Sequence, residues 1–167
     1  MNPARFWPPE GTAVTEVLVV YLHFAAMILI AVFLAIEYLI CVPGLAQERV
    51  KLLARIDLFY LIAAVLALAT GVAQLFWFGK GAGFYLHNPV FYIKLALFVA
   101  VGLISVPPTM QYLRWMRMLK IGAGAVAADF EVLRARRYVL VEFVLFAFIP
   151  LLAVLMARGI GVEVPGN

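Results

Sequence analysis

The sequence predicts an all-α integral membrane protein that folds as a single bundle of four membrane-spanning helices. Of its 167 residues, 66% are hydrophobic and only 13% are charged, and the mean hydropathy is +1.06. Soluble proteins are about half apolar and about a quarter charged. The long apolar segments show no alternation with a period of two, which excludes a transmembrane barrel. Cys41 is the single cysteine, which excludes a disulfide-stapled secreted domain.

We expect helices over about residues 13–42, 56–78, 89–110 and 138–156. Each is about as long as the hydrocarbon core requires, and one domain covers residues 1–167. Residues 1–11 are polar and proline-rich and lack a cleavable-signal pattern, so the first segment is expected to stay as a helix.

Proline, glycine and asparagine mark the ends of these segments. Pro43-Gly44 ends the first helix, and Asn88-Pro89 gives the third helix an N-cap and a proline in its first turn. Pro107-Pro108 is expected to kink or end the third helix, and Pro150 to bend the fourth. Residues 111–137, which include Trp115 among basic residues, are expected to form a cytoplasmic interfacial segment.

The basic residues predict the orientation of the bundle. Nine of the 13 Lys and Arg residues flank the connections between the first two and the last two helices: Arg49, Lys51, Arg55, Arg114, Arg117, Lys120, Arg134, Arg136 and Arg137. Only Arg5, Lys80 and Arg158 belong to the other side. The excess places these connections in the cytoplasm and both termini on the periplasmic side. Because these charges would face lipid headgroups, a nucleic-acid partner is not expected.

Ionisable side chains inside membrane helices are costly and usually functional. Those near the outer end are His23 and Lys94, accompanied by Gln74, and those in the cytoplasmic half are Glu37, Arg55, Asp57 and Glu142. His23 is too deep to reach the interface and needs a hydrogen-bond partner or a metal. Two interpretations stay open for it: a cofactor ligand, or a buried histidine bonded to Gln74 or a backbone carbonyl.

The other polar residues also have two interpretations. Lys94 is close enough to the outer interface to extend toward it. Glu37, Asp57 and Arg55 are either ordinary interfacial charges or mutually neutralising partners, with Arg136 or Arg137 as further cations. Glu142 lies about a turn inside the membrane and is either paired with an arginine or functional.

An inward histidine in a membrane bundle is typical of haem sites. Two histidines in the whole chain are too few for a four-histidine, two-haem cytochrome. One haem ligated by His23 is compatible with the sequence, with Met156 better placed than Met27 for the opposite side of the iron. The small-residue stripe Ala63, Ala67 and Gly71 is expected to serve helix packing. No catalytic triad or phosphate-binding loop is found.

Three stretches carry a family resemblance: Tyr21 to Phe24, Arg55 to Leu58 with Ala69 to Gly71, and Tyr85 to Pro89 with Lys94 to Leu97. With them the chain resembles a bacterial family of four-helix membrane proteins of unknown function, over about residues 20–115. More distantly it resembles HemJ-type protoporphyrinogen oxidases and the membrane domain of CopD copper proteins. The HemJ likeness implies a haem-binding bundle with catalytic residues at His23, Lys94 and Arg55. The chain departs from that pattern in the spacing of His87 from Lys94 and in Pro43-Gly44-Leu45 after the first helix.

The resulting hypothesis is a HemJ-like protein of the bacterial inner membrane that binds haem b or another tetrapyrrole and takes part in redox chemistry. His23 is the metal ligand, and Lys94, Gln74 and Met156 complete the cofactor site. Arg55 anchors the inner end through salt bridges. One alternative is a non-catalytic scaffold or accessory subunit that binds other membrane proteins or a second copy of itself. Another is a small transporter or CopD-like metal-handling protein, against which the scarcity of His and Met clusters speaks.

Overall fold

The computed structural model describes residues 10–78, 83, 86–122 and 127–158. Within them the elements are α1 (Glu10–Ile40), α2 (Gln47–Ala73), the π-helical turn η2 (Gln74–Phe78), α4 (Pro89–Lys120) and α5 (Asp129–Ala157). None of the described residues belongs to a strand. The predicted all-α fold with four long helices is therefore confirmed.

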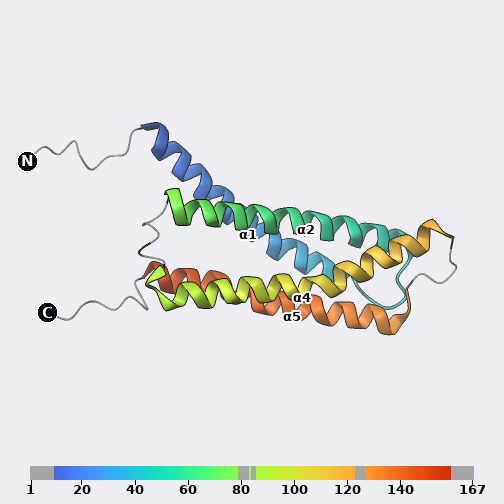
Figure 1. Cartoon of the computed structure of the whole chain (residues 1–167). Coiled ribbons are helices and arrows are strands. Elements are labelled where there is room, and N and C mark those ends of the chain that lie inside the picture. The colour runs from blue at the N-terminus through green and yellow to red at the C-terminus, as the bar shows by residue number, and fades with distance from the viewer. Residues whose placement is uncertain (1–9, 79–82, 84–85, 123–126, 159–167) are drawn as a thin grey trace, which may run out of the picture.

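The helices form a ring in which each packs against two neighbours. α1 contacts α2 and α5, and α4 contacts the same two helices. The start of α1, the end of α2, the start of α4 and the end of α5 gather at one end of the bundle, at the left of Figure 1. We call this the N-terminal end. The opposite end carries the arginine-rich parts of α2, α4 and α5, and we call it the basic end.

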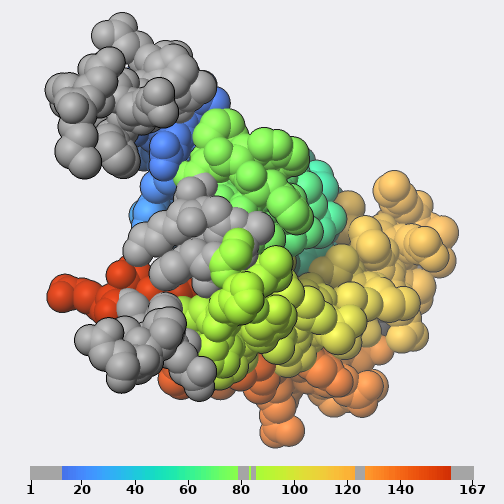
Figure 2. Space-filling view, turned by 60° about the vertical axis from the view of Figure 1, so that its left-hand side comes forward, coloured from blue at the N-terminus to red at the C-terminus, as the bar shows by residue number. Residues whose placement is uncertain are grey.

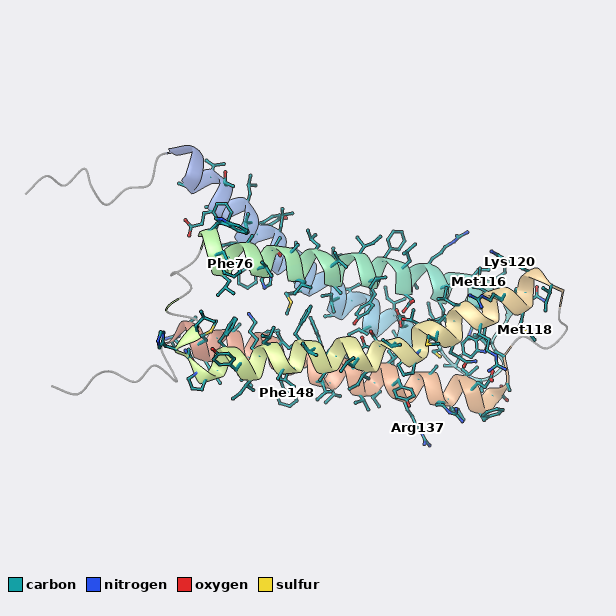
Figure 3. All side chains as sticks on the ribbon, in the orientation of Figure 1. Phe76, Met116, Met118, Lys120, Arg137 and Phe148 are labelled. Carbon is teal, nitrogen blue, oxygen red and sulfur yellow. The ribbon has the colours of Figure 1, made fainter. Side chains whose placement is uncertain are left out.

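All four helices are long and apolar enough to cross a membrane, with candidate spans of 28 to 32 residues. Large apolar side chains such as Phe59, Leu103 and Phe148 are exposed on their outer faces. Figure 3 shows side chains projecting outward along the whole bundle. Such continuous apolar surface is unfavourable in water and suits contact with lipid, because the helices satisfy their own backbone hydrogen bonds.

A central apolar core separates the two ends. Ala26, Ile30 and Leu34 lie on the inward face of α1 and are fully buried. They pack with Tyr60 and Ala63 of α2 and with residues of the other two helices in one hydrophobic cluster. The buried positions on α1 recur every four residues, as expected for one face of a helix.

The helices extend further at the basic end than the apolar segments predict. α4 continues through Pro107 and Pro108 to Lys120, although the expected end was near Met110. Each proline removes one intrahelical hydrogen bond, which bends a helix but does not have to end it. α4 bends in its yellow part in Figure 1. The expected N-cap at the other end of α4 is confirmed, because Asn88 accepts a hydrogen bond from the Val90 amide at 2.9 Å.

The starts of α2 and α5 also lie further toward the basic end than the apolar segments predict. α2 starts at Gln47 rather than near residue 56, and α5 starts at Asp129 rather than near residue 138. Both early segments are charged, but their apolar side chains recur on one face and are buried, as with Val132 and Ala135. Most of the predicted interfacial segment 111–137 is thus helical. Its Trp115 and Tyr112 pack into a second hydrophobic cluster at the basic end.

Candidate functional site

His23 lies on α1 near the N-terminal end and is held by α2. Its Nδ1 atom is 3.0 Å from the backbone oxygen of Ala67 and 3.1 Å from Thr70 Oγ1. A carbonyl oxygen only accepts hydrogen bonds, so Nδ1 carries the proton and donates it toward Ala67. The Thr70 hydroxyl donates its own proton to the Leu66 carbonyl at 2.6 Å. The lone pairs of Thr70 Oγ1 are therefore available to the Nδ1–H of His23. In the neutral ring, the available lone pair is therefore on Nε2.

Small residues on α2 allow this close approach. A Cβ atom added to Gly71 would lie 3.3 Å from Cε1 of His23 and 3.7 Å from its Nδ1. Ala63 and Ala67, two turns and one turn earlier, are buried against the core. The stripe Ala63, Ala67 and Gly71 therefore packs helices as expected, and its last member also seats the imidazole ring.

A cavity of about 390 Å³ adjoins His23, and all four helices contribute to its wall. Its polar lining comes from His23 on α1, Gln74 at the start of η2 and Lys94 on α4. Met156 on α5 also lines it, and the rest of the wall is mainly aliphatic and aromatic. We call it the His23 cavity. A concave, mostly apolar site with a few polar groups is typical of small-molecule binding.

Two donors in the wall, on Gln74 and Lys94, have no hydrogen bond or ion pair among the described residues. Among the described residues, Gln74 Nε2 is buried and makes no hydrogen bond, and Lys94 is in neither of the ion pairs found there. Gln74 opens the π-helical turn η2, and such turns inside helices frequently mark functional sites. The cavity wall thus offers hydrogen-bond donors that an acceptor-rich ligand could satisfy.

The mouth of the His23 cavity opens beside the lipid-facing surface of α1. Phe24 and Ile28 belong to its lining and are both exposed. Figure 1 shows α1 diverging from α5 toward the N-terminal end. Figure 2 turns this end partly toward the viewer, with α1 in blue, the start of α4 in yellow-green and the end of α5 in red.

The structure brings together four of the five predicted site residues. His23, Lys94, Gln74 and Met156 all line the one cavity. Arg55 does not join them, because it is exposed and lies 16 residues before Gly71 on α2, about 24 Å along the helix. The sequence did not indicate Thr70 as a partner of His23, nor that the carbonyl it contacts belongs to Ala67. Of the partners considered, the backbone carbonyl is the one observed, and Gln74 is not.

The second polar layer lies toward the basic end. Glu37, Asp57 and Glu142 are buried there on α1, α2 and α5, and we call them the carboxyl cluster. Pairing with arginines was one of the interpretations left open for these acids, but no such ion pair occurs in the described part of the chain. Arg136 lies over the ring of Tyr38 at 4.3 Å. Arg137 is exposed and points away from the bundle in Figure 3.

Four apolar helices of membrane-spanning length, packed around a lateral cavity, define a multi-pass membrane protein. Residues 15–161 match the family described as "Predicted membrane protein (DUF2214)", and the chain belongs to this family. The resemblance to a four-helix membrane family of unknown function is thereby confirmed. No curated protein and no solved structure matches the chain. The more distant likeness to HemJ-type enzymes and CopD proteins stays an expectation.

Proposed function

We propose that this protein binds haem b, or another tetrapyrrole, in the His23 cavity and takes part in redox chemistry in the bacterial inner membrane. The observation that carries the proposal is the 3.0 Å contact between His23 Nδ1 and the backbone oxygen of Ala67. The Nδ1–H of His23 is committed to the Ala67 carbonyl, which leaves Nε2 as the metal-binding atom. Histidines that bind metals are oriented in this way, by donation of the other ring N–H to a carbonyl or carboxylate.

The residues of the cavity wall fit such a group. The largely apolar lining suits a flat macrocycle, and a haem would supply an iron centre for one-electron chemistry. The Met156 thioether, on α5, is a second ligand of the kind that haem iron accepts. Lys94 and Gln74 donate hydrogen bonds and suit the carboxylates that tetrapyrroles carry. Arg55 has no place in this site.

Absorption spectroscopy on the detergent-purified protein tests the proposal. We expect a Soret band in the wild type, either as isolated or after titration with haem, and its loss in His23→Ala. The matched control is His87→Ala, because His87 is exposed and its Nδ1 is bonded to the Gly83 carbonyl at 2.7 Å. That variant should keep the band.

Two results would overturn the proposal. One is a wild-type protein that stays colourless after haem titration while it keeps its helical circular dichroism. The other is a Soret band of equal intensity in wild type and His23→Ala. Either result would favour the accessory-subunit alternative, in which the exposed helix faces bind other membrane proteins. Co-purification of a stoichiometric membrane partner would then be expected.

A further inference from the structure

The carboxyl cluster is separate from the His23 cavity and is not used by the proposed function. Glu37, Asp57 and Glu142 are 2%, 8% and 1% exposed. Glu37 is 14 residues from His23 on α1, about 21 Å along the helix. The buried Ile30 and Leu34 lie between them. The cluster therefore needs an explanation of its own.

The hydrogen bonds of the cluster are incomplete in a particular way. Tyr112 donates to Glu37 Oε2 at 3.5 Å, and Thr109 donates to Asp57 Oδ1 at 2.7 Å. Within the described residues, the second oxygens of Glu37 and Glu142, both Oε1, are buried and have no hydrogen-bond partner. A buried carboxylate normally has both oxygens satisfied, so these two atoms point to something that is bound there.

Among the described residues, no ion pair joins a basic side chain to these acids. Glu37 faces Asp57 and Tyr60 from α2, Tyr112 from α4, and Glu142 from α5. The neighbouring groups on α1 and directly after it are Tyr38 and Cys41, and the nearby Arg136 lies over the Tyr38 ring. Glu142 faces Tyr60 and Asp57 from α2. The groups that face the two acids are thus hydroxyls, a thiol and other acids, apart from this one arginine.

Three ionised carboxyl groups in such a place would repel one another and lose their hydration. A buried acid in this situation takes up a proton and becomes neutral. A metal ion is a poor alternative, because the described residues hold no group of three or more His, Cys, Asp or Glu side chains close enough to coordinate one. A proton, unlike a metal ion, needs only one oxygen atom, and Oε1 of Glu37 and Oε1 of Glu142 are each able to carry one.

We propose that Glu37 and Glu142 form a proton-binding site in the basic half of the bundle, each holding one exchangeable proton on its carboxyl group. Asp57 keeps the hydrogen bond from Thr109 and sets the local negative potential that retains the two protons. The site exchanges protons with the aqueous phase at the basic end. It does so independently of any ligand in the His23 cavity.

Dicyclohexylcarbodiimide tests this proposal, because it reacts with protonated carboxyl groups in apolar surroundings. The acid proton moves to a carbodiimide nitrogen while the carboxyl oxygen attacks the central carbon, so the adduct contains the whole reagent and no leaving group. We expect adducts on Glu37 and Glu142 by mass spectrometry of the purified full chain, with yields that fall as the pH rises. Glu37→Gln and Glu142→Gln should each lose the adduct at the changed position.

Glu131 is the internal control. It pairs with Arg114 at 3.4 Å and accepts a hydrogen bond from Trp115 Nε1 at 3.1 Å, so both carboxyl oxygens have partners and it should stay unlabelled. Infrared spectra of the wild type give a measurement that needs no variant. They should show the carbonyl stretch of a protonated acid, shifted in heavy water.

Three outcomes would overturn the proposal. The first is the lack of adducts on both glutamates at every pH, and the second is the lack of an acid carbonyl band in the wild-type spectrum. The third is protection of the glutamates by sodium ions at constant pH, which would assign the site to a metal cation.

Discussion

The His23 cavity and the carboxyl cluster both place polar groups inside the bundle, but they differ in how those groups are hydrogen-bonded. At the N-terminal end, the His23 Nδ1–H is satisfied by a carbonyl of α2, and a cavity of about 390 Å³ adjoins the ring. In the carboxyl cluster, Glu37 and Glu142 are almost fully buried, and each has an oxygen without a partner in the part of the chain that the structure describes. The comparison teaches that one bundle can satisfy a buried polar group with its own backbone in one layer and leave carboxyl oxygens without a partner in the other, and the two proposals differ on this point.

The largest effect is expected from a substitution at Gly71, which packs against the imidazole ring of His23. Gly71→Leu would place a side chain where even a Cβ atom comes 3.3 Å from His23 Cε1. We expect displacement of the ring, loss of tetrapyrrole binding, and a loss of about 1–3 kcal/mol in stability from overpacking. Absorption spectra and thermal unfolding in detergent measure the two effects.

The control for this variant is Gly102→Leu on α4. A Cβ atom at Gly102 meets no atom within 4 Å, so the same substitution should leave the cavity intact. Equal loss of binding in both variants would show that the effect comes from general destabilisation of the bundle. It would contradict a specific role for the contact between Gly71 and His23.

A smaller effect is expected when a single hydroxyl is removed from each layer. Thr70→Val deletes one of the two acceptors near His23 Nδ1, while the Ala67 carbonyl stays. We expect tetrapyrrole affinity to fall by about tenfold, the low end of the effect of losing a group that orients a metal ligand. Titration with haem provides the measurement.

Thr109→Val is the matching change in the carboxyl cluster, where Thr109 donates to Asp57. It should leave haem affinity unchanged and alter only the pH at which carbodiimide labelling declines. If Thr109→Val weakened haem binding as much as Thr70→Val, the two layers would be one coupled site and the comparison would fail.

The smallest effect concerns the reaction of the buried Cys41 thiol, at the basic end, with a reagent from the water phase. Cys41 follows α1, is fully buried and lies 3.5 Å from the Val132 carbonyl. Burial raises the pKa of its thiol to about 11. Because the thiolate is the reactive form, a water-soluble maleimide should label it very slowly at neutral pH and readily after denaturation in detergent.

The same thiol gives a pH dependence with a definite sign. Its folded pKa is above the ordinary value of 9.0, so the unfolded chain loses the proton first and stability should fall between about pH 9 and 11. Ala153→Cys in a Cys41→Ser background places a thiol in the cavity wall instead. It should react with maleimide faster than Cys41, and an equal rate would contradict the difference in packing.

Much of this architecture is predictable from the sequence. Apolar length predicts four helices, and the positions of His23, Gln74, Lys94 and Met156 predict their common level in the bundle. The rotation of each helix about its axis decides which side chains meet. For this reason the pairing of His23 with the Ala67 carbonyl rather than Gln74 emerges only from the structure.

The basic end was less predictable. Hydropathy locates apolar runs but does not locate helix ends, and it therefore stops α4 and α5 short of their charged turns. Arginines near the acids in sequence were natural candidates to neutralise them. In the structure Arg55 and Arg137 are exposed, and Arg136 lies over Tyr38. The uncompensated state of Glu37 and Glu142 could only be recognised from their burial.

The position of the cavity mouth, beside the exposed Phe24 and Ile28, affects how a ligand arrives. A compound that enters there dissolves first in the hydrocarbon of the bilayer, which then acts as its reservoir. Occupancy would depend on the partition coefficient of the ligand and on the amount of lipid present, more than on its concentration in water. Affinities measured in detergent micelles should therefore change with the detergent-to-protein ratio.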